Sequence, residues 1–159
     1  MRASQNGFTM IEVLVALLIL SVGLLGIAGM QTLSVQMNVS ARQSSQATYL
    51  AYDIIDRMRA NRQAALGGAY DYDSDGCQKT PGTNNVAEKD LTTWLNMLCG
   101  MTTDGNEAPP MLPQDSTKGT GAVVAVNDGV ATVTVKWYDE RWAQTGDDPV
   151  RTVTIQAAL

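Results

Sequence analysis

The sequence predicts an α+β protein in which one long N-terminal helix packs on a small antiparallel sheet of three to four strands. Three observations predict this: no proline occurs in residues 8–63, a long apolar run opens that segment, and two alternating segments flank a hairpin turn near the C-terminus. The 159 residues, 45% hydrophobic and 17% charged, are typical of one ordered domain.

The apolar run predicts that the first half of this helix spans a membrane. No charged residue lies between Glu12 and Arg42, a gap of 29 residues, and residues 13–30 read VLVALLILSVGLLGIAGM. About 18 to 20 such residues cross the hydrocarbon core, whereas a secretory signal would be shorter and would end at a cleavage site of small residues. The leader, residues 1–7, carries Arg2 and no acid, which favours a cytoplasmic N-terminus and an exported remainder.

Gly23, Gly26 and Gly29 recur at every third residue within the predicted spanning segment, residues 8–30. Each weakens a helix by about 1 kcal/mol relative to alanine. They provide either helix flexibility, as a hinge or a zone of local melting, or only the ordinary glycine content of membrane helices.

The second half of the helix, residues 31–66, is predicted to be amphipathic and to end at Gly67-Gly68. Its spaced apolar residues are Leu33, Met37, Tyr49, Leu50, Ile54 and Met58. Leu50, Ile54 and Met58 have i, i+4, i+8 spacing, so we expect a small sheet to cover them.

Residues 67–120 are rich in turn-forming residues and predict an irregular region with one short helix, residues 86–98, whose apolar residues include Trp94, Leu95 and Leu98. Cys99 should end that helix. If this region is exported, Cys99 is expected to form a disulfide with Cys77, closing a loop of about 23 residues and contributing about 3 kcal/mol. The alternative is two buried thiols in a reducing compartment.

The segment 121–159 is predicted to be the sheet. Strands at residues 122–126 and 131–137 flank Asp128-Gly129, a strong hairpin signal. The turn sets a register that pairs Val126 with Ala131, Val124 with Val133 and Ala122 with Val135. In a third strand, residues 150–157, Val153, Ile155 and Ala157 should point inward.

An acidic segment, residues 71–76, matches the first half of a calcium loop, with Asp71, Asp73 and Asp75 as ligands. The second half fails, because Gly82 stands where the loop needs a glutamate. We therefore expect a solvated acidic turn and no metal or other cofactor, with Ca²⁺ as the alternative.

The composition argues against enzymatic and nucleic-acid-binding functions. The chain has no histidine, which removes the commonest general base and zinc ligand. Residues 63–159 hold six basic and 13 acidic residues, a net charge of −7 that should repel nucleic-acid phosphates.

Glu12 lies at the cytoplasmic edge of the apolar run, where a carboxylate entering lipid costs a few kcal/mol. Either this charge has a partner, or it stays at the headgroup level, where the helix dipole favours it.

The run Gly7-Phe8-Thr9-Met10-Ile11-Glu12, with the apolar residues that follow it, resembles the prepilin signature of type IV pilins and secretion pseudopilins. The resemblance implies the type IV pilin fold, cleavage between Gly7 and Phe8 by prepilin peptidase, N-methylation of Phe8, and a role for Glu12 in filament assembly. There the carboxylate is thought to meet the N-terminal amine of a neighbouring pilin subunit.

A second stretch, TYLAYDIIDRMRANR at residues 48–62, is similar to minor pilins of the PilV type, with Asp56 where glutamate is usual. This likeness covers about the first 65 residues. It implies a minor pilin that supports pilus biogenesis, adhesion, twitching motility or DNA uptake, with other major and minor pilins as partners.

The expected location is the inner membrane, with a periplasmic head, before assembly and the cell-surface pilus afterwards. Two other functions fit parts of the sequence. A minor pseudopilin of a type II secretion system shares every N-terminal argument, and a membrane-anchored periplasmic sensor or enzyme would use the head alone.

Overall fold

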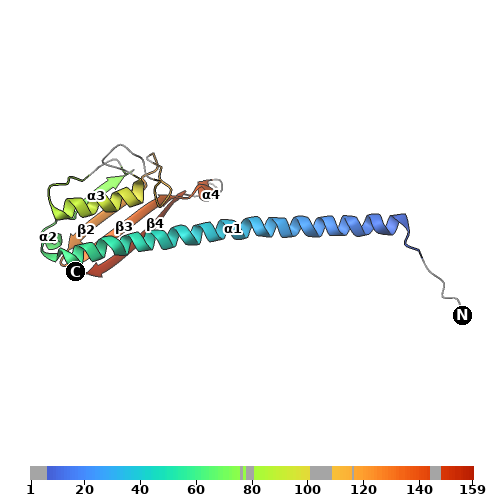
Figure 1. The fold of residues 1–159 in the computed structure, drawn as a ribbon, viewed down its shortest axis with the longest axis horizontal. Coiled ribbons are helices and arrows are strands. Elements are labelled where there is room, and N and C mark those ends of the chain that lie inside the picture. The colour runs from blue at the N-terminus through green and yellow to red at the C-terminus, as the bar shows by residue number, and fades with distance from the viewer. Residues whose placement is uncertain (1–6, 76, 78–80, 101–108, 116, 144–147) are drawn as a thin grey trace. The chain divides into compact units, whose positions relative to one another are not determined.

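The structure, a computed structural model, describes residues 7–75, 77, 81–100, 109–115, 117–143 and 148–159. The elements, in order, are α1 (Met10–Ala60), α2 (Arg62–Leu66), β1 (Tyr72–Asp75), α3 (Val86–Cys99), β2 (Gly121–Asn127), β3 (Val130–Tyr138), α4 (Glu140–Ala143) and β4 (Val150–Ala158) (Figure 1). The chain divides into two compact units, one ending at Ser40 and the other, hereafter the head, comprising Ala41–Leu159.

The sheet of the head is antiparallel, with strand order β1-β2-β3-β4. Asp128 and Gly129 connect β2 to β3 with φ values of 50° and 76°, as the predicted two-residue hairpin requires. The expected pairs are all present: Val126 with Ala131, Val124 with Val133, and Ala122 with Val135. The α+β prediction with three to four strands is confirmed.

The C-terminal part of α1 supplies the centre of the core. Leu50, Ile54 and Met58 are completely buried, as their spacing predicts, and Ala47, Ala51 and Ile55 are buried with them. The other spaced apolar residues of this half, Leu33, Met37 and Tyr49, are exposed, and Tyr49 is 58% exposed. Consecutive residues lie about 100° apart around a helix, so Tyr49 points away from the face that carries Leu50.

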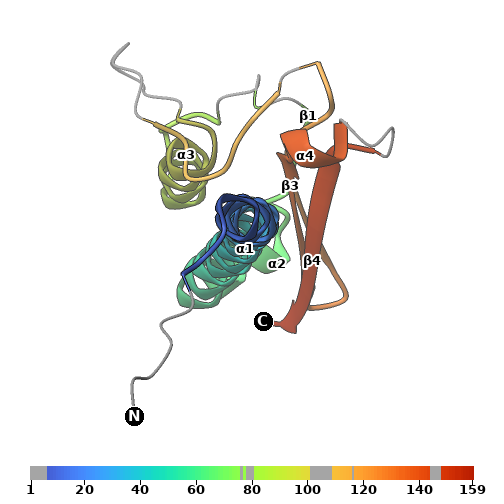
Figure 2. The same ribbon diagram turned by 90° about the vertical axis from the view of Figure 1, so that its right-hand side faces the viewer.

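Helix α3 lies on the same side of the sheet as α1 (Figure 2). Asn85 caps its start, because the Asn85 side-chain oxygen accepts a hydrogen bond from the Glu88 N–H. The helix ends at Cys99, as expected, and the next residue, Gly100, has a left-handed backbone conformation. Its predicted apolar face, Trp94, Leu95 and Leu98, is buried.

Two local features differ from prediction. A single helix was expected to continue to residue 66, but α1 ends at Ala60. Helix α2 follows after Asn61, whose side-chain amide donates to the Tyr70 hydroxyl. The residues expected to form an acidic turn instead form β1, because the β2 main chain provides hydrogen-bond partners and Tyr72 enters the core.

Candidate functional site

The N-terminal signature forms a capped helix start. Gly7 and Phe8 are exposed and precede α1. The Thr9 side-chain oxygen accepts a hydrogen bond from the Glu12 N–H (3.4 Å), and the Thr9 carbonyl accepts one from the Val13 N–H (3.3 Å). Because α1 begins after Thr9, the Gly7-Phe8 peptide bond lies outside the helix. The spacing of Thr9 and Glu12 is that of a capping box, the one sequence signal that could have predicted this cap.

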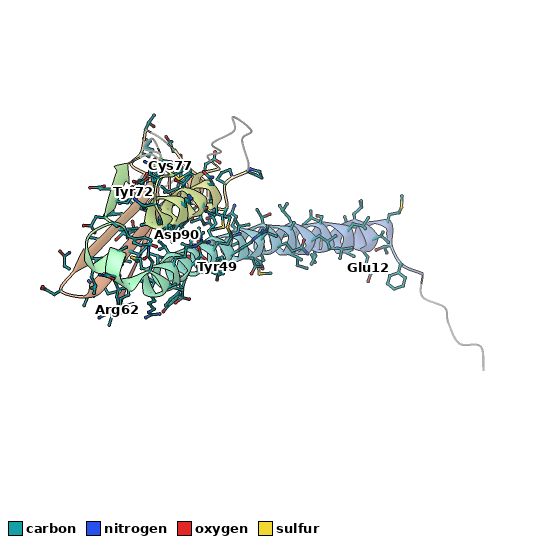
Figure 3. All side chains as sticks on the ribbon, turned by 60° about the vertical axis from the view of Figure 1, so that its left-hand side comes forward. Glu12, Tyr49, Arg62, Tyr72, Cys77 and Asp90 are labelled. Carbon is teal, nitrogen blue, oxygen red and sulfur yellow. A yellow bond between two sulfur atoms is a disulfide. The ribbon has the colours of Figure 1, made fainter. Side chains whose placement is uncertain are left out.

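Glu12 projects from the first turn of α1, at the end of the helix labelled in Figure 3. Its side chain is exposed, and among the described residues no basic side chain forms an ion pair with it. The residues that share its side of the helix are Phe8, Val13, Ala16, Leu17 and Leu20. The position therefore combines one carboxylate with an apolar surface, and a cationic group from outside the chain can reach it.

The side chains in the apolar half of α1 are not covered by any other residue that the structure describes. An 18-residue window within α1 has a mean hydropathy of 2.7 and is 0% buried, and among the described residues this helix alone is long and apolar enough to cross a membrane. Large apolar side chains are exposed from Phe8 to Val39. Such a surface requires lipid or other apolar helices around it.

Gly23, Gly26 and Gly29 lie within α1, which continues through them without a break. A Cβ atom at any of the three would meet nothing within 4 Å. No contact with a described residue therefore requires glycine there, and a role in helix flexibility stays a prediction.

The comparisons with known proteins bear on this segment. Residues 2–28 match a family model described as the prokaryotic N-terminal methylation motif. This motif is the N-terminal signal of type IV pilin-like prepilins; it supports the pilin and pseudopilin superfamily, and it implies processing by a prepilin peptidase and pilin-type assembly partners. Together with the apolar helix, it fits membrane anchoring before assembly. No curated protein and no solved structure matches the chain.

The stretch at residues 48–62 holds α3 against α1 through a polar network. Arg57 contacts Asp53 one turn earlier (Nε to Oδ2, 2.9 Å) and Asp90 of α3 (Nη1 to Oδ1, 3.4 Å). The Tyr70 hydroxyl donates to the other Asp90 oxygen (2.6 Å) and accepts from the Asn61 amide (3.3 Å). This network gives Asp53, Arg57 and Asn61 a structural role in packing the head. From the sequence alone, the stretch could be linked only to a family.

The network changes the ionisation of its members. Burial, assisted by the hydrogen bond to the Asp90 carboxylate, raises the pKa of Tyr70 to about 12. Burial alone would lower the pKa of Arg57, but the carboxylates of Asp53 and Asp90 outweigh it and raise the pKa. Tyr70 therefore stays a neutral donor and Arg57 a cation.

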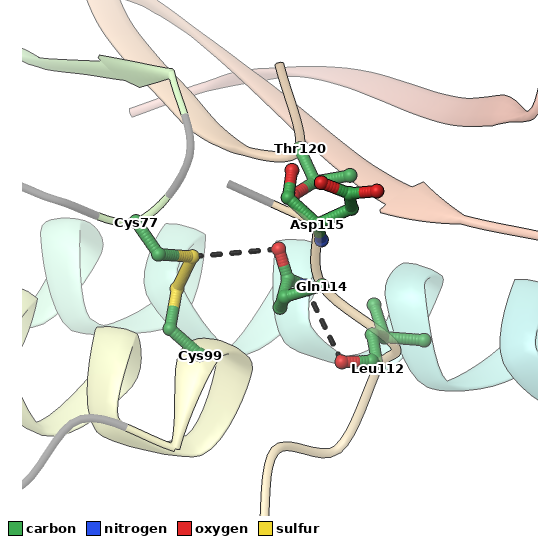
Figure 4. Close-up of a disulfide and its surroundings, with 6 residues drawn as sticks. All are labelled: Cys77, Cys99, Leu112, Gln114, Asp115 and Thr120. Atoms are coloured by element: carbon green, nitrogen blue, oxygen red, sulfur yellow. Dashed lines mark hydrogen bonds between the residues drawn. A yellow bond between two sulfur atoms is a disulfide. The ribbon is translucent and has the colours of Figure 1, made fainter. Parts of the chain in front are cut away.

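Cys77 and Cys99 form a disulfide that ties the segment after β1 to the end of α3, with 6.0 Å between their Cα atoms. The loop before β2 lies beside this bridge (Figure 4). Oε1 of Gln114 is 3.4 Å from the Cys77 sulfur, and the Gln114 amide donates to the Leu112 carbonyl. The bridge and Gln114 therefore bring together the segment after β1, the end of α3 and the loop before β2.

The predicted calcium ligands lie along β1: Asp71 precedes it, Asp73 lies within it and Asp75 is its last residue. The Asp71 carboxylate accepts a hydrogen bond from the Val126 N–H (3.0 Å), which links it to the sheet, and Asp73 is exposed. The Asp75 side chain and Gly76 lie outside the described residues. In the part of the chain that is described, no group of three or more acidic or cysteine side chains could hold a metal ion. Calcium binding stays a prediction.

Proposed function

We propose that this chain is a minor pilin of the PilV type, inserted into a type IV pilus or into the complex that initiates it. One observation carries the proposal: an exposed Gly7-Phe8 bond directly precedes a capped, uncovered apolar helix whose first turn holds Glu12. The similarity of residues 48–62 to PilV-type minor pilins supports the subtype. In this role the protein supports pilus assembly, and through it adhesion, twitching motility or DNA uptake.

Cleavage after Gly7 would leave a new, N-methylated amine on Phe8 at the start of α1. That amine is positive and lies at the positive end of the helix dipole, so it favours an anionic partner. Glu12 of a neighbouring subunit supplies one. Pairing the two charges reduces the cost of placing each among apolar helices, because a buried charge is tolerated when it is paired.

The head would lie in the periplasm before assembly and on the pilus surface afterwards. Its role is structural rather than enzymatic, and it acts through packing with major and minor pilins. The glycines at 23, 26 and 29 would let α1 adapt as the subunit leaves the bilayer.

Intact mass and N-terminal sequencing of protein from its native membrane, without reducing agent, test the processing. We expect a chain that begins at N-methylated Phe8 and that is two hydrogens lighter than its reduced form. An uncut chain from cells with active prepilin peptidase contradicts the proposal and favours a membrane-anchored protein whose head acts alone.

The Glu12→Ala variant tests assembly separately from processing. We expect it to be inserted and cleaved but absent from sheared pili, as measured by immunoblotting of the pilus fraction. Glu140→Ala removes an exposed carboxylate of the head and is the matched control, which should enter pili normally. Normal incorporation of Glu12→Ala would refute the role of this carboxylate.

A further inference from the structure

Strand β4 is a long edge strand with few of the features that usually protect such edges, its one charged residue being Arg151. It has nine residues and pairs with β3 in nine consecutive positions, so it contains no bulge. Its sequence, VRTVTIQAA, has no proline, glycine, lysine or acid. Natural proteins normally shorten, charge, bend or cover an edge of this kind, because its free main-chain groups pair readily with another strand.

Hydrogen bonds at the two ends of the β3–β4 ladder show which main-chain groups face outward. The Leu159 N–H donates to the Gly129 carbonyl, and the Asp139 N–H donates to the Pro149 carbonyl. In an antiparallel ladder hydrogen-bonded pairs alternate with non-bonded ones, so odd-numbered residues of β4 bond to β3. The outward-facing groups belong to the even-numbered residues Val150, Thr152, Thr154, Gln156 and Ala158.

At each end of this edge, one outward-facing main-chain group has a hydrogen-bond partner within the chain. The Val150 N–H donates to the Asp148 carboxylate (2.9 Å). At the other end, the Ala158 carbonyl accepts from Nε and Nη2 of Arg59, each at 3.4 Å. Between these ends, the outward N–H and C=O groups of Thr152, Thr154 and Gln156 have no partner among the described residues.

We propose that a second copy of this chain pairs with this edge, antiparallel and centred on Thr154. In this register the two Thr154 residues exchange N–H and C=O bonds across a two-fold axis, and Thr152 does the same with Gln156 of the second copy. All the unpartnered groups of the three residues are then satisfied. The next outward-facing groups along the strand are the Val150 N–H and the Ala158 C=O. Both already have hydrogen-bond partners within the chain, Asp148 and Arg59.

The side chains fit the same register. On the inner face, half-buried Val153 lies opposite Ile155 of the second copy, so each covers apolar surface that β4 leaves open. On the outer face, threonine and glutamine side chains meet each other. The one charged residue of the strand, Arg151, faces Ala157 of the second copy, so no like charges are opposed. A shift by one residue would place apolar side chains opposite polar ones.

The two-fold symmetry also determines the relative directions of the two heads. Within the head, α1 and β4 run in the same direction, with Arg59 near the end of one contacting Ala158 near the end of the other (Figure 1). The two-fold axis of an antiparallel pair reverses both. The two heads of the proposed pair therefore run in opposite directions.

Single-cysteine variants of the full chain in detergent micelles test the register, with the Cys77–Cys99 bridge left in place. Thr154→Cys should form a disulfide-linked dimer under mild oxidation, because residues in a hydrogen-bonded antiparallel pair have Cα atoms about 5.5 Å apart, within the range for a disulfide. Thr134→Cys, on the same face of the neighbouring strand, is the matched control and should stay monomeric. Thr152→Cys and Gln156→Cys should cross-link when mixed, but neither should cross-link alone.

Thr154→Pro tests the contact without a new cysteine. The Thr154 N–H faces away from β3, so proline should leave the head folded while removing the central hydrogen bonds. We expect concentration-dependent dimers of the wild-type chain in sedimentation velocity and their loss in this variant. A monomeric wild-type chain, dimers unaffected by Thr154→Pro, or equal cross-linking of Thr154→Cys and Thr134→Cys would each overturn the proposal, while leaving processing at Gly7 and the role of Glu12 untouched.

Discussion

Trp94 of α3 donates its indole N–H to the main-chain oxygen of Leu50 in α1, across 2.7 Å. Both residues are fully buried. The Leu50 carbonyl lies in a regular part of α1, so this bond adds to the helical hydrogen bonds. One bond therefore joins the helix that carries the N-terminal signature to the helix that ends at the disulfide.

Removing this bond should destabilise the head in two graded steps. Trp94→Phe keeps most of the ring but loses the donor, and should lower the free energy of unfolding by about 1 to 2 kcal/mol. Trp94→Ala also leaves a cavity and should cost about 3 to 5 kcal/mol. Urea unfolding of the full chain in detergent, followed by circular dichroism, measures both. Tyr49→Phe, at an exposed position, should change little.

Alkaline pH should destabilise the head through Tyr70. The pKa of Tyr70 is raised to about 12 in the folded chain, against about 10 in the unfolded chain. Its contribution is therefore fully present below pH 10 and is lost as the pH rises through 12, by an amount on the order of 2 kcal/mol. Tyr70→Phe should be less stable at neutral pH and should lose less stability above pH 10. Equal losses in the two proteins would contradict this assignment.

Acid should weaken the end of the sheet at Asp139. Burial raises the pKa of this carboxyl, but hydrogen bonds and charge from Arg141 prevail and hold the pKa below its ordinary value. The stability it contributes is present above about pH 4 and is lost as the pH falls through the folded-state pKa. Thermal unfolding of Asp139→Asn should therefore differ most from wild type at neutral pH and converge with it in acid.

Reduction of the Cys77–Cys99 bridge should lower the free energy of unfolding by about 3 kcal/mol, because the reduced unfolded chain regains the entropy of a free loop. The double variant Cys77→Ala/Cys99→Ala should match the reduced wild-type chain and should not respond to reductant. A reductant effect that persists in the double variant would show that the loss has another origin.

Loss of the Thr9 cap should fray the first turn of α1. Thr9→Ala removes the side-chain oxygen that accepts from the Glu12 N–H and should cost about 1 kcal/mol of local helix stability. Faster amide hydrogen exchange at residues 10–13 in micelles would report this, and Thr9→Ser should preserve protection. If Thr9→Ala exchanges as slowly as wild type, the cap contributes nothing.

Local rules predicted much of the fold from the sequence. Asp128-Gly129 determined both the hairpin and the register, because a two-residue turn with two positive φ values allows one pairing. The i, i+4, i+8 spacing of Leu50, Ile54 and Met58 places them on one side of a helix, and this predicted the buried face of α1.

Features that depend on distant partners could not be predicted in this way. Strand β1 forms only because β2, far along the chain, pairs with it, and its acidic residues alone favour a turn. The network of Arg57 with Asp90 likewise joins residues 33 positions apart. At the N-terminus, a charge within an apolar run distinguishes Glu12 in the sequence, whereas the Thr9 cap is a local contact that the signature alone does not indicate.

The position of β4 in the chain affects when the head can fold. Arg59 contacts the Ala158 carbonyl across 99 residues, and β4 is synthesised after every other described element. Until β4 is present, β3 remains an open edge, because β4 is its pairing partner on that side. Because β4 completes the sheet last, a chain that stops before residue 150 leaves β3 as an exposed edge that can pair with other chains or bind chaperones.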